Sequence, residues 1–307
     1  MIGDIKYPMK KTVLFLLLAC LILTASTSMA APSKSQELPS VQPSQTRVDL
    51  GDFKVKDVDA FADWLARHPG LEQVDMYESR LKADQIDTLA ERFPRISFGW
   101  TIRLTEDHYI RTDATAFAIN HSNKSPVHKS ADFRQLKYCK NLMALDLGHN
   151  AIDDISFLYD LPQLRVIILA SNLITDITPL SSLKDLEYAE LFNNYITDYS
   201  PLAGLDQLID LNIAFNQTQD FTPLYGLKGL ERLWVYNANN RNCDDPVDPE
   251  LVAGLQAALP GAQINSTSYS TLGGWRTHER YYVVFNMLHG AVSWLPWDAQ
   301  GLVPRYN

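Results

Sequence analysis

Histidines are the first residues of this 307-residue chain whose chemistry suggests metal binding or catalysis. His121 and His128 share one polar stretch, and His149 follows further along. No two histidines have the i, i+4 spacing of a helical zinc site, and none has C-x-x-C partners. We therefore expect solvated loop histidines and no metal ion or cofactor.

The segment Thr277-His278-Glu279-Arg280 also combines acid and base groups, near the tryptophans of the C-terminal region. Acyl transfer needs a nucleophile as well, and no motif such as G-x-S-x-G accompanies these residues. We therefore predict no catalytic residues and no enzyme. An active site in this tail remains a less favoured alternative.

A second group of residues could act by non-covalent binding. It combines aromatic rings with carboxylates and recurs along the last third of the patterned region: Tyr188, Glu190, Phe192, Asp210, Phe215, Trp234 and Tyr236. Aromatic side chains are frequent anchors of protein interfaces. These seven residues are the predicted ligand-binding site, provided that the fold turns them toward solvent.

A sequence repeat determines where these side chains point. Leucine returns every 22 residues, and asparagine follows each leucine at position nine. The leucines are Leu142, Leu164, Leu186, Leu208 and Leu230, and the asparagines are Asn150, Asn172, Asn194 and Asn216. A fixed period in the twenties, headed by L-x-x-L-x-L-x-x-N, is typical of leucine-rich repeats, in which each unit contributes one short strand.

Within such a strand, alternate side chains face opposite sides. Positions four and six, such as Leu145 and Leu147, should face the core, and positions three and five should line a concave face. The predicted binding residues fall on that face or on the turn that follows it. For Trp234 and Tyr236 a second explanation is equally open, because a C-terminal cap could cover the last coil.

Two polar positions have structural explanations. The asparagine at position nine can satisfy backbone groups of its own and the adjacent coil. Position thirteen is always acidic: Asp154, Asp176, Asp198 and Asp220. A calcium-binding row is one interpretation. We favour side-chain caps of the convex turn, because calcium loops cluster several oxygens within one loop.

The repeat N-x-I-x-D-I-x-P-L-x-x-L resembles that of the internalin-type leucine-rich-repeat proteins of bacterial surfaces, and Asn172 to Leu183 is the closest copy. The resemblance extends at most from Asn120 to Tyr236. It implies an α/β solenoid: a leucine-rich-repeat horseshoe or arc with parallel concave strands, irregular N-terminal cap repeats and a C-terminal cap. It also implies recognition of a protein at the concave face.

The chain divides into five predicted parts. They are a signal peptide (1–30), a flexible tether (31–47), an N-terminal cap with divergent repeats (48–113), a repeat array (114–240, regular over 142–229) and a C-terminal cap (241–307). In the last part we expect a helix over Pro249 to Leu259 and a β-hairpin from Tyr281 to Met287 and Ala291 to Leu295.

The N-terminal residues predict export. Lys10-Lys11 precede an apolar run, Thr12 to Thr24, and Ser28-Met29-Ala30 fits the small-x-small cleavage pattern. The run is short for a membrane span, so no transmembrane segment is expected in the mature chain. We predict a secreted or cell-surface protein, cleaved near Ala30. Lipid attachment at Cys20 is the less favoured alternative.

The net charge limits the class of partner, and the cysteine positions limit the possible disulfides. The formal net charge of -9 argues against a nucleic-acid partner, which requires a basic face. Cys139 takes a leucine position and should be a core residue, too far from Cys243 for a disulfide. The leading hypothesis is therefore a protein-binding module, and a carbohydrate or envelope-binding module using the same aromatics is the alternative.

Overall fold

The computed structural model describes residues 38–119, 127–236, 247–267 and 274–289, all within the unit Leu38–Asn307. The predicted signal peptide, Cys243 and the predicted strand Ala291 to Leu295 lie outside the described residues. So does most of the polar stretch that contains His121.

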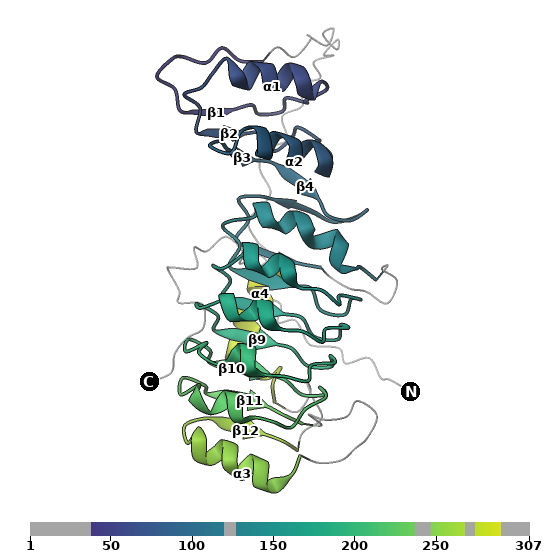
Figure 1. The fold of residues 1–307 in the computed structure, drawn as a ribbon, viewed down its shortest axis with the longest axis vertical. Coiled ribbons are helices and arrows are strands. Elements are labelled where there is room, and N and C mark those ends of the chain that lie inside the picture. The colour runs from purple at the N-terminus through teal and green to yellow at the C-terminus, as the bar shows by residue number, and fades with distance from the viewer. Residues whose placement is uncertain (1–37, 120–126, 237–246, 268–273, 290–307) are drawn as a thin grey trace, which may run out of the picture. The chain divides into compact units, whose positions relative to one another are not determined.

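Short parallel strands form a ladder that follows the chain order (Figure 1). The first parallel sheet contains β1 (Arg47–Asp49), β2 (Gln73–Asp75) and β3 (Ser97–Gly99), and an antiparallel pair follows, β4 (Thr101–Arg103) and β5 (Tyr109–Arg111). A seven-stranded parallel sheet then contains β6 (Ala116–Ala118), β7 (Ala144–Asp146), β8 (Val166–Ile168), β9 (Tyr188–Glu190), β10 (Asp210–Asn212), β11 (Arg232–Trp234) and β12 (Gln263–Asn265).

Helical segments return the chain from one strand to the next within each parallel sheet. The α-helices are α1 (Val58–Ala66), α2 (Ala83–Arg92), α3 (Pro249–Ala258) and α4 (Glu279–His289). The connections from β6 to β11 are 3-10 segments instead: η1 (Ser130–Tyr138), η2 (Ser156–Asp160), η3 (Thr178–Ser182), η4 (Ser200–Leu202) and η5 (Thr222–Gly226). The segment expected to be helical, Pro249 to Leu259, is helical from Pro249 to Ala258.

The register of the ladder matches the sequence period. Leu145 pairs with Ile167, and Leu211 pairs with Leu233, residues 22 positions apart. These residues and the repeat leucines are fully buried in one continuous core. Cys139 also lies in this core, as its leucine position predicted.

The asparagine ladder joins neighbouring coils. The amide nitrogen of Asn172 donates to the carbonyl oxygens of Leu169 in its own coil and of Leu147 in the preceding coil, both at 3.0 Å. Its side-chain oxygen accepts from the backbone N–H of Ile152 at 3.0 Å. Asn194 and Asn216 repeat this pattern with 0% exposure. The predicted role of position nine is confirmed.

The acidic row caps the turns on the opposite side of each coil. The carboxylates accept backbone N–H bonds from the residue two positions later, as in Asp176 from Thr178 at 2.8 Å and Asp198 from Ser200 at 2.7 Å. Hydrogen bonds from the side chain and backbone of Thr178 lower the pKa of Asp176. The predicted caps are confirmed.

Two expectations were wrong. Tyr281 to Met287 belongs to helix α4 and not to a strand of a hairpin. Its inward residues, Arg280 and Val284, are four positions apart, so packing against the sheet selects a helix despite the β-branched pair Val283-Val284. His128 is buried, not solvated, because its ring packs edge-on against His108 and Phe133.

Replacing Asn194 by leucine should lower the free energy of unfolding by about 1–3 kcal/mol or more, because it orphans buried backbone groups in two coils. Denaturant unfolding measures this value. Asn193→Gly is the comparison variant: it removes a half-buried bond to the Ser171 hydroxyl at 2.9 Å but orphans no backbone group, and glycine adopts the positive φ of 58° without strain. Equal stability of Asn194→Leu and the wild type would rule out the bridging role.

Candidate functional site

The predicted binding residues on strands β9 to β11 lie on the side of the seven-stranded sheet that faces away from the leucine core, here called the strand face. Tyr188 and Trp234 belong to a hydrophobic cluster separate from that core. The strand register therefore placed these side chains correctly. None of the described helices is long and apolar enough to cross a membrane.

The expected exposure of these residues was wrong. Tyr188 and Asp210 are 0% exposed, and Glu190 and Trp234 are 2% exposed. Phe192 and Phe215 are also buried, and Tyr236 is half-buried with its ring 5.5 Å from that of Phe215. The strand face is therefore not an open aromatic strip.

Residues 274–289 of the chain itself close much of this face. The ring of Trp275 lies 5.5 Å from the ring of Tyr188 and 5.5 Å from that of Trp234, where it meets Trp234 edge-on. Helix α4 then runs past β6 and β7, and Val284 joins the same buried cluster. In Figure 1 this helix, in yellow, lies beside strands that are distant in the sequence. The burial of Trp234 is thus explained by the C-terminal segment that covers it.

A buried ion cluster fastens α4 to the sheet. The carboxylate of Asp210 accepts two hydrogen bonds from Arg232, at 3.0 and 2.5 Å, and two from Arg280, at 2.9 and 2.8 Å. Arg280 also donates to Glu231, and the Arg232 guanidinium lies 4.4 Å from the centre of the Trp275 ring. A buried carboxylate is costly unless it is fully paired, and two arginine forks satisfy Asp210. Sequence reasoning missed this role of Arg280.

His278 lies at the start of the same helix. Its Nδ1 accepts a hydrogen bond from the backbone N–H of Arg280 at 3.2 Å. Burial and the neighbouring Arg232 and Arg280 lower the pKa of His278. Within this segment, Arg280 therefore attaches α4 to the sheet, and His278 bonds the first turn of the helix.

Glu190 is a second buried carboxylate on the strand face. It accepts a hydrogen bond from the hydroxyl of Tyr188. Burial raises the pKa of Glu190, and burial likewise raises that of Tyr188. Burying Tyr188 and Glu190 together therefore costs less free energy when Glu190 is protonated than when it is ionised.

An opening remains between the strand face and α4. It is a pocket of about 260 Å³, lined among others by Asp146, His149, Glu190, Phe192, Arg276 and Tyr281. His149 is held with a positive φ of 60° at the turn after β7, a conformation also found at Ser171, Asn193 and Phe215. The charged and aromatic side chains that line this pocket suit the recognition of polar groups. Among the described residues, no group of three His, Cys, Asp or Glu could hold a metal ion.

The outward side of α4 presents an aromatic cluster next to this pocket. Tyr281 stacks on Phe285 with ring centres 6.1 Å apart, and its ring meets that of Tyr282 edge-on at 6.0 Å. Tyr282 is 52% exposed and Phe285 is 45% exposed. The i, i+4 spacing of Tyr281 and Phe285 was the sequence signal that could have revealed it.

A family model described as Leucine Rich repeats (2 copies) matches residues 140–183. Together with the parallel ladder, it shows that the chain contains leucine-rich repeats and folds as an α/β solenoid of that kind. No curated protein matches the chain.

Among solved structures, internalin C2 of Listeria monocytogenes is 28% identical, over 50% of this chain and 74% of that one, with a TM-score of 0.35. A second internalin of that species is 19% identical over 71% and 67%, with a TM-score of 0.34. A leucine-rich-repeat protein of Leptospira interrogans is 20% identical over 66% and 56%, with a TM-score of 0.42.

Replacing Arg280 by methionine should release α4. Asp210 then keeps only Arg232, and breaking a buried ion pair costs about 3–5 kcal/mol, so amide exchange in 279–289 should accelerate by roughly a hundredfold or more. Hydrogen-exchange mass spectrometry measures this rate. Asn286→Ala, an exposed change on the same helix, is the control. Equal exchange in both variants would contradict the anchoring role.

Replacing Glu190 by glutamine should change how stability depends on pH. Because the folded-state pKa is raised, the contribution of protonated Glu190 is present below its unfolded pKa of about 4.3 and is lost as pH rises through the folded value. Glutamine stays neutral, so the Tm of Glu190→Gln should rise relative to wild type as pH increases from about 4 to 7. The exposed change Glu72→Gln should show no such trend, and a pH-independent Tm difference for Glu190→Gln would refute this assignment.

Proposed function

We propose that the protein is a secreted or surface-displayed leucine-rich-repeat module that binds a protein partner. The observation that carries this proposal is the aromatic cluster of α4 beside the polar pocket on the strand face, in which Tyr282 and Phe285 are exposed and Tyr281 is half-buried. Repeat arrays of this kind commonly offer an extended recognition surface, which supports a partner of protein size. Export rests on the N-terminal pattern that ends near Ala30.

The partner surface that we propose is composite. Asp146 and Arg276 supply charge at the pocket and His149 supplies a polar ring, with Glu190 and Phe192 in its wall. The exposed rings on α4 provide apolar anchors at its edge, and aromatic residues beside an arginine are the composition that interface centres favour.

The other predicted site residues act indirectly in this proposal. Tyr188, Asp210 and Trp234 hold the C-terminal segment that carries the exposed rings. Phe215 and Tyr236 pack on each other further along the sheet. In this proposal these residues hold the composite surface in place and do not themselves contact the partner.

A photo-crosslinking residue at position 282 should capture the partner, whereas the same residue at Tyr159, on the 3-10 turn η2, should not. Tyr159 is 53% exposed, so the two positions are matched in accessibility. Once the partner is identified, Tyr282→Ala should weaken its affinity about tenfold, as a central anchor does, with little change in Tm.

Capture at 159 but not at 282 would place the partner on the other side of the coils. Binding of Tyr282→Ala at wild-type affinity would remove the aromatic cluster from the interface. A glycan array that gives a specific ligand, with no protein captured at either position, would favour the carbohydrate alternative.

A further inference from the structure

A second and larger pocket lies where the strand ladder is interrupted. The first parallel sheet ends at β3, and only Trp100 separates it from β4, which pairs antiparallel with β5. The hairpin therefore takes the place that the next parallel strand would occupy. Beside it is a cavity of about 670 Å³, a size typical of small-molecule sites.

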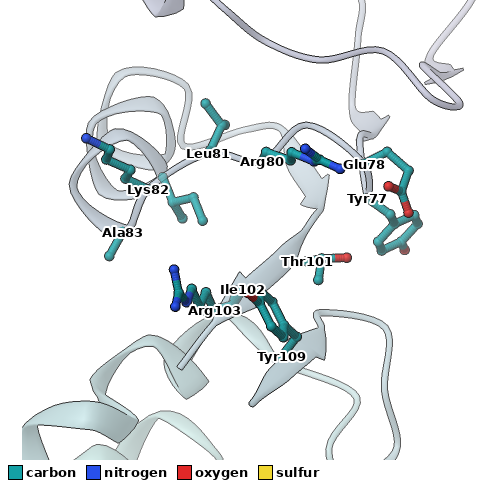
Figure 2. Close-up of a pocket in the computed structure, with 11 residues that line it drawn as sticks. Tyr77, Glu78, Arg80, Leu81, Lys82, Ala83, Thr101, Ile102, Arg103 and Tyr109 are labelled. Atoms are coloured by element: carbon teal, nitrogen blue, oxygen red, sulfur yellow. The ribbon is translucent and has the colours of Figure 1, made fainter. Parts of the chain in front are cut away.

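The cavity is formed by two elements that face each other. Figure 2 shows the start of the α2 coil, Arg80 to Ala83, on one side and the hairpin residues Thr101 to Arg103 with Tyr109 on the other. Leu81, Ile86 and Ile102 are buried beneath and supply apolar surface. The lining thus combines an apolar floor with several polar and charged groups, more polar than most small-molecule pockets.

Cations outnumber carboxylates in the lining. Three cations, Arg80, Lys82 and Arg103, line the pocket together with one acid, Glu78. The carboxylate of Glu78 is already 3.2 Å from the amine of Lys54. In the part of the chain that the structure describes, none of the three cations forms a salt bridge. The chain as a whole carries a net charge of -9, so this positive excess is local.

Backbone contacts hold Arg103 at the wall without neutralising it. Its guanidinium donates to the carbonyl oxygens of Thr105 at 3.2 Å and Glu106 at 3.1 Å, and lies 5.8 Å from the centre of the Tyr109 ring. Both acceptors are uncharged backbone oxygens. The same side chain also borders a neighbouring hollow lined by Asp84, Asp87 and Asp132. Arg80 has a positive φ of 60°, an uncommon conformation for a long side chain.

Aromatic rings complete the walls. The side chain of Tyr109 is 56% exposed at the pocket. The ring of Tyr77 also lines it, and the Arg111 guanidinium carbon lies 3.6 Å from the centre of that ring. Exposed rings beside arginines offer a flat surface for stacking and a charge for an acidic group in one place. A neutral or cationic ligand would leave the cations unpaired.

We propose that this pocket binds a small organic anion, in which a carboxylate, sulfate or phosphate group is attached to a ring-shaped or apolar body. The anionic group lies between Arg80 and Arg103, and the body contacts Tyr109 and the apolar floor. This site is independent of the partner surface on α4, so either can fail without the other.

Isothermal titration calorimetry of the full chain tests the proposal with defined probes. The anionic probes are 2-naphthoate, 2-naphthyl sulfate, 2-naphthyl phosphate and glucuronate, and the controls are neutral 2-naphthamide and inorganic phosphate. At least one anionic probe should bind more tightly than both controls, and added NaCl should weaken it. The three naphthyl anions distinguish the acidic groups, and glucuronate distinguishes a sugar body from an aromatic one.

Arg103→Gln and Arg80→Gln should each weaken the preferred probe about tenfold or more, because each removes a charge-assisted contact. Arg95→Gln, an exposed arginine outside the pocket, should bind as the wild type does. Two pocket variants are used so that a folding defect in one, seen as a lower Tm, leaves the other informative.

Equal binding of 2-naphthamide and 2-naphthoate would overturn the proposal. So would equal weakening by Arg95→Gln and the pocket variants, or the absence of binding by every anionic probe up to about 10 mM. Binding of inorganic phosphate as tightly as the best probe would show that the apolar body contributes nothing.

Discussion

Each coil of this solenoid must satisfy backbone polar groups where the chain leaves its strand, and the buried asparagine ladder meets that constraint. One amide side chain bonds its own coil and the coil before it, as Asn172 does to Leu169 and Leu147. The leucines can then pack as one continuous core without orphaned donors. Because the strands are locked in register, residues 22 positions apart align across the sheet, and Tyr188, Asp210 and Arg232 become neighbours.

That alignment gathers large aromatic rings on the strand face, and the chain covers them with its own C-terminal segment. Trp275 fills the space between Tyr188 and Trp234, and Arg280 completes the pairing of Asp210. The rings of Tyr188 and Trp234 are buried, and the exposed aromatic rings on this side are those of Tyr282 and Phe285 on α4. In the proposed function, recognition therefore involves the exposed rings of α4 as well as the strands that the helix covers.

The repeat was predictable because its signal is local and periodic. Leucine and asparagine positions determined the strands, the core and the polar ladder, and the acidic residues predicted the caps of the convex turns. Helix α4 was not predictable in this way, since its anchor Arg280 meets Asp210 across 70 positions of sequence. The pair Val283-Val284 favours a strand locally, and contacts with the sheet override that preference.

Closure of the strand face by residues 274–289 is the central claim, and hydroxyl-radical footprinting of the full chain tests it most directly. Tyr188, Trp234 and Trp275 should be protected, whereas Tyr282 should be oxidised readily. In a chain ending at residue 273, Tyr188 and Trp234 should lose their protection. Oxidation of Trp234 in the full chain as fast as that of Tyr282 would show that the face is open and would contradict the account.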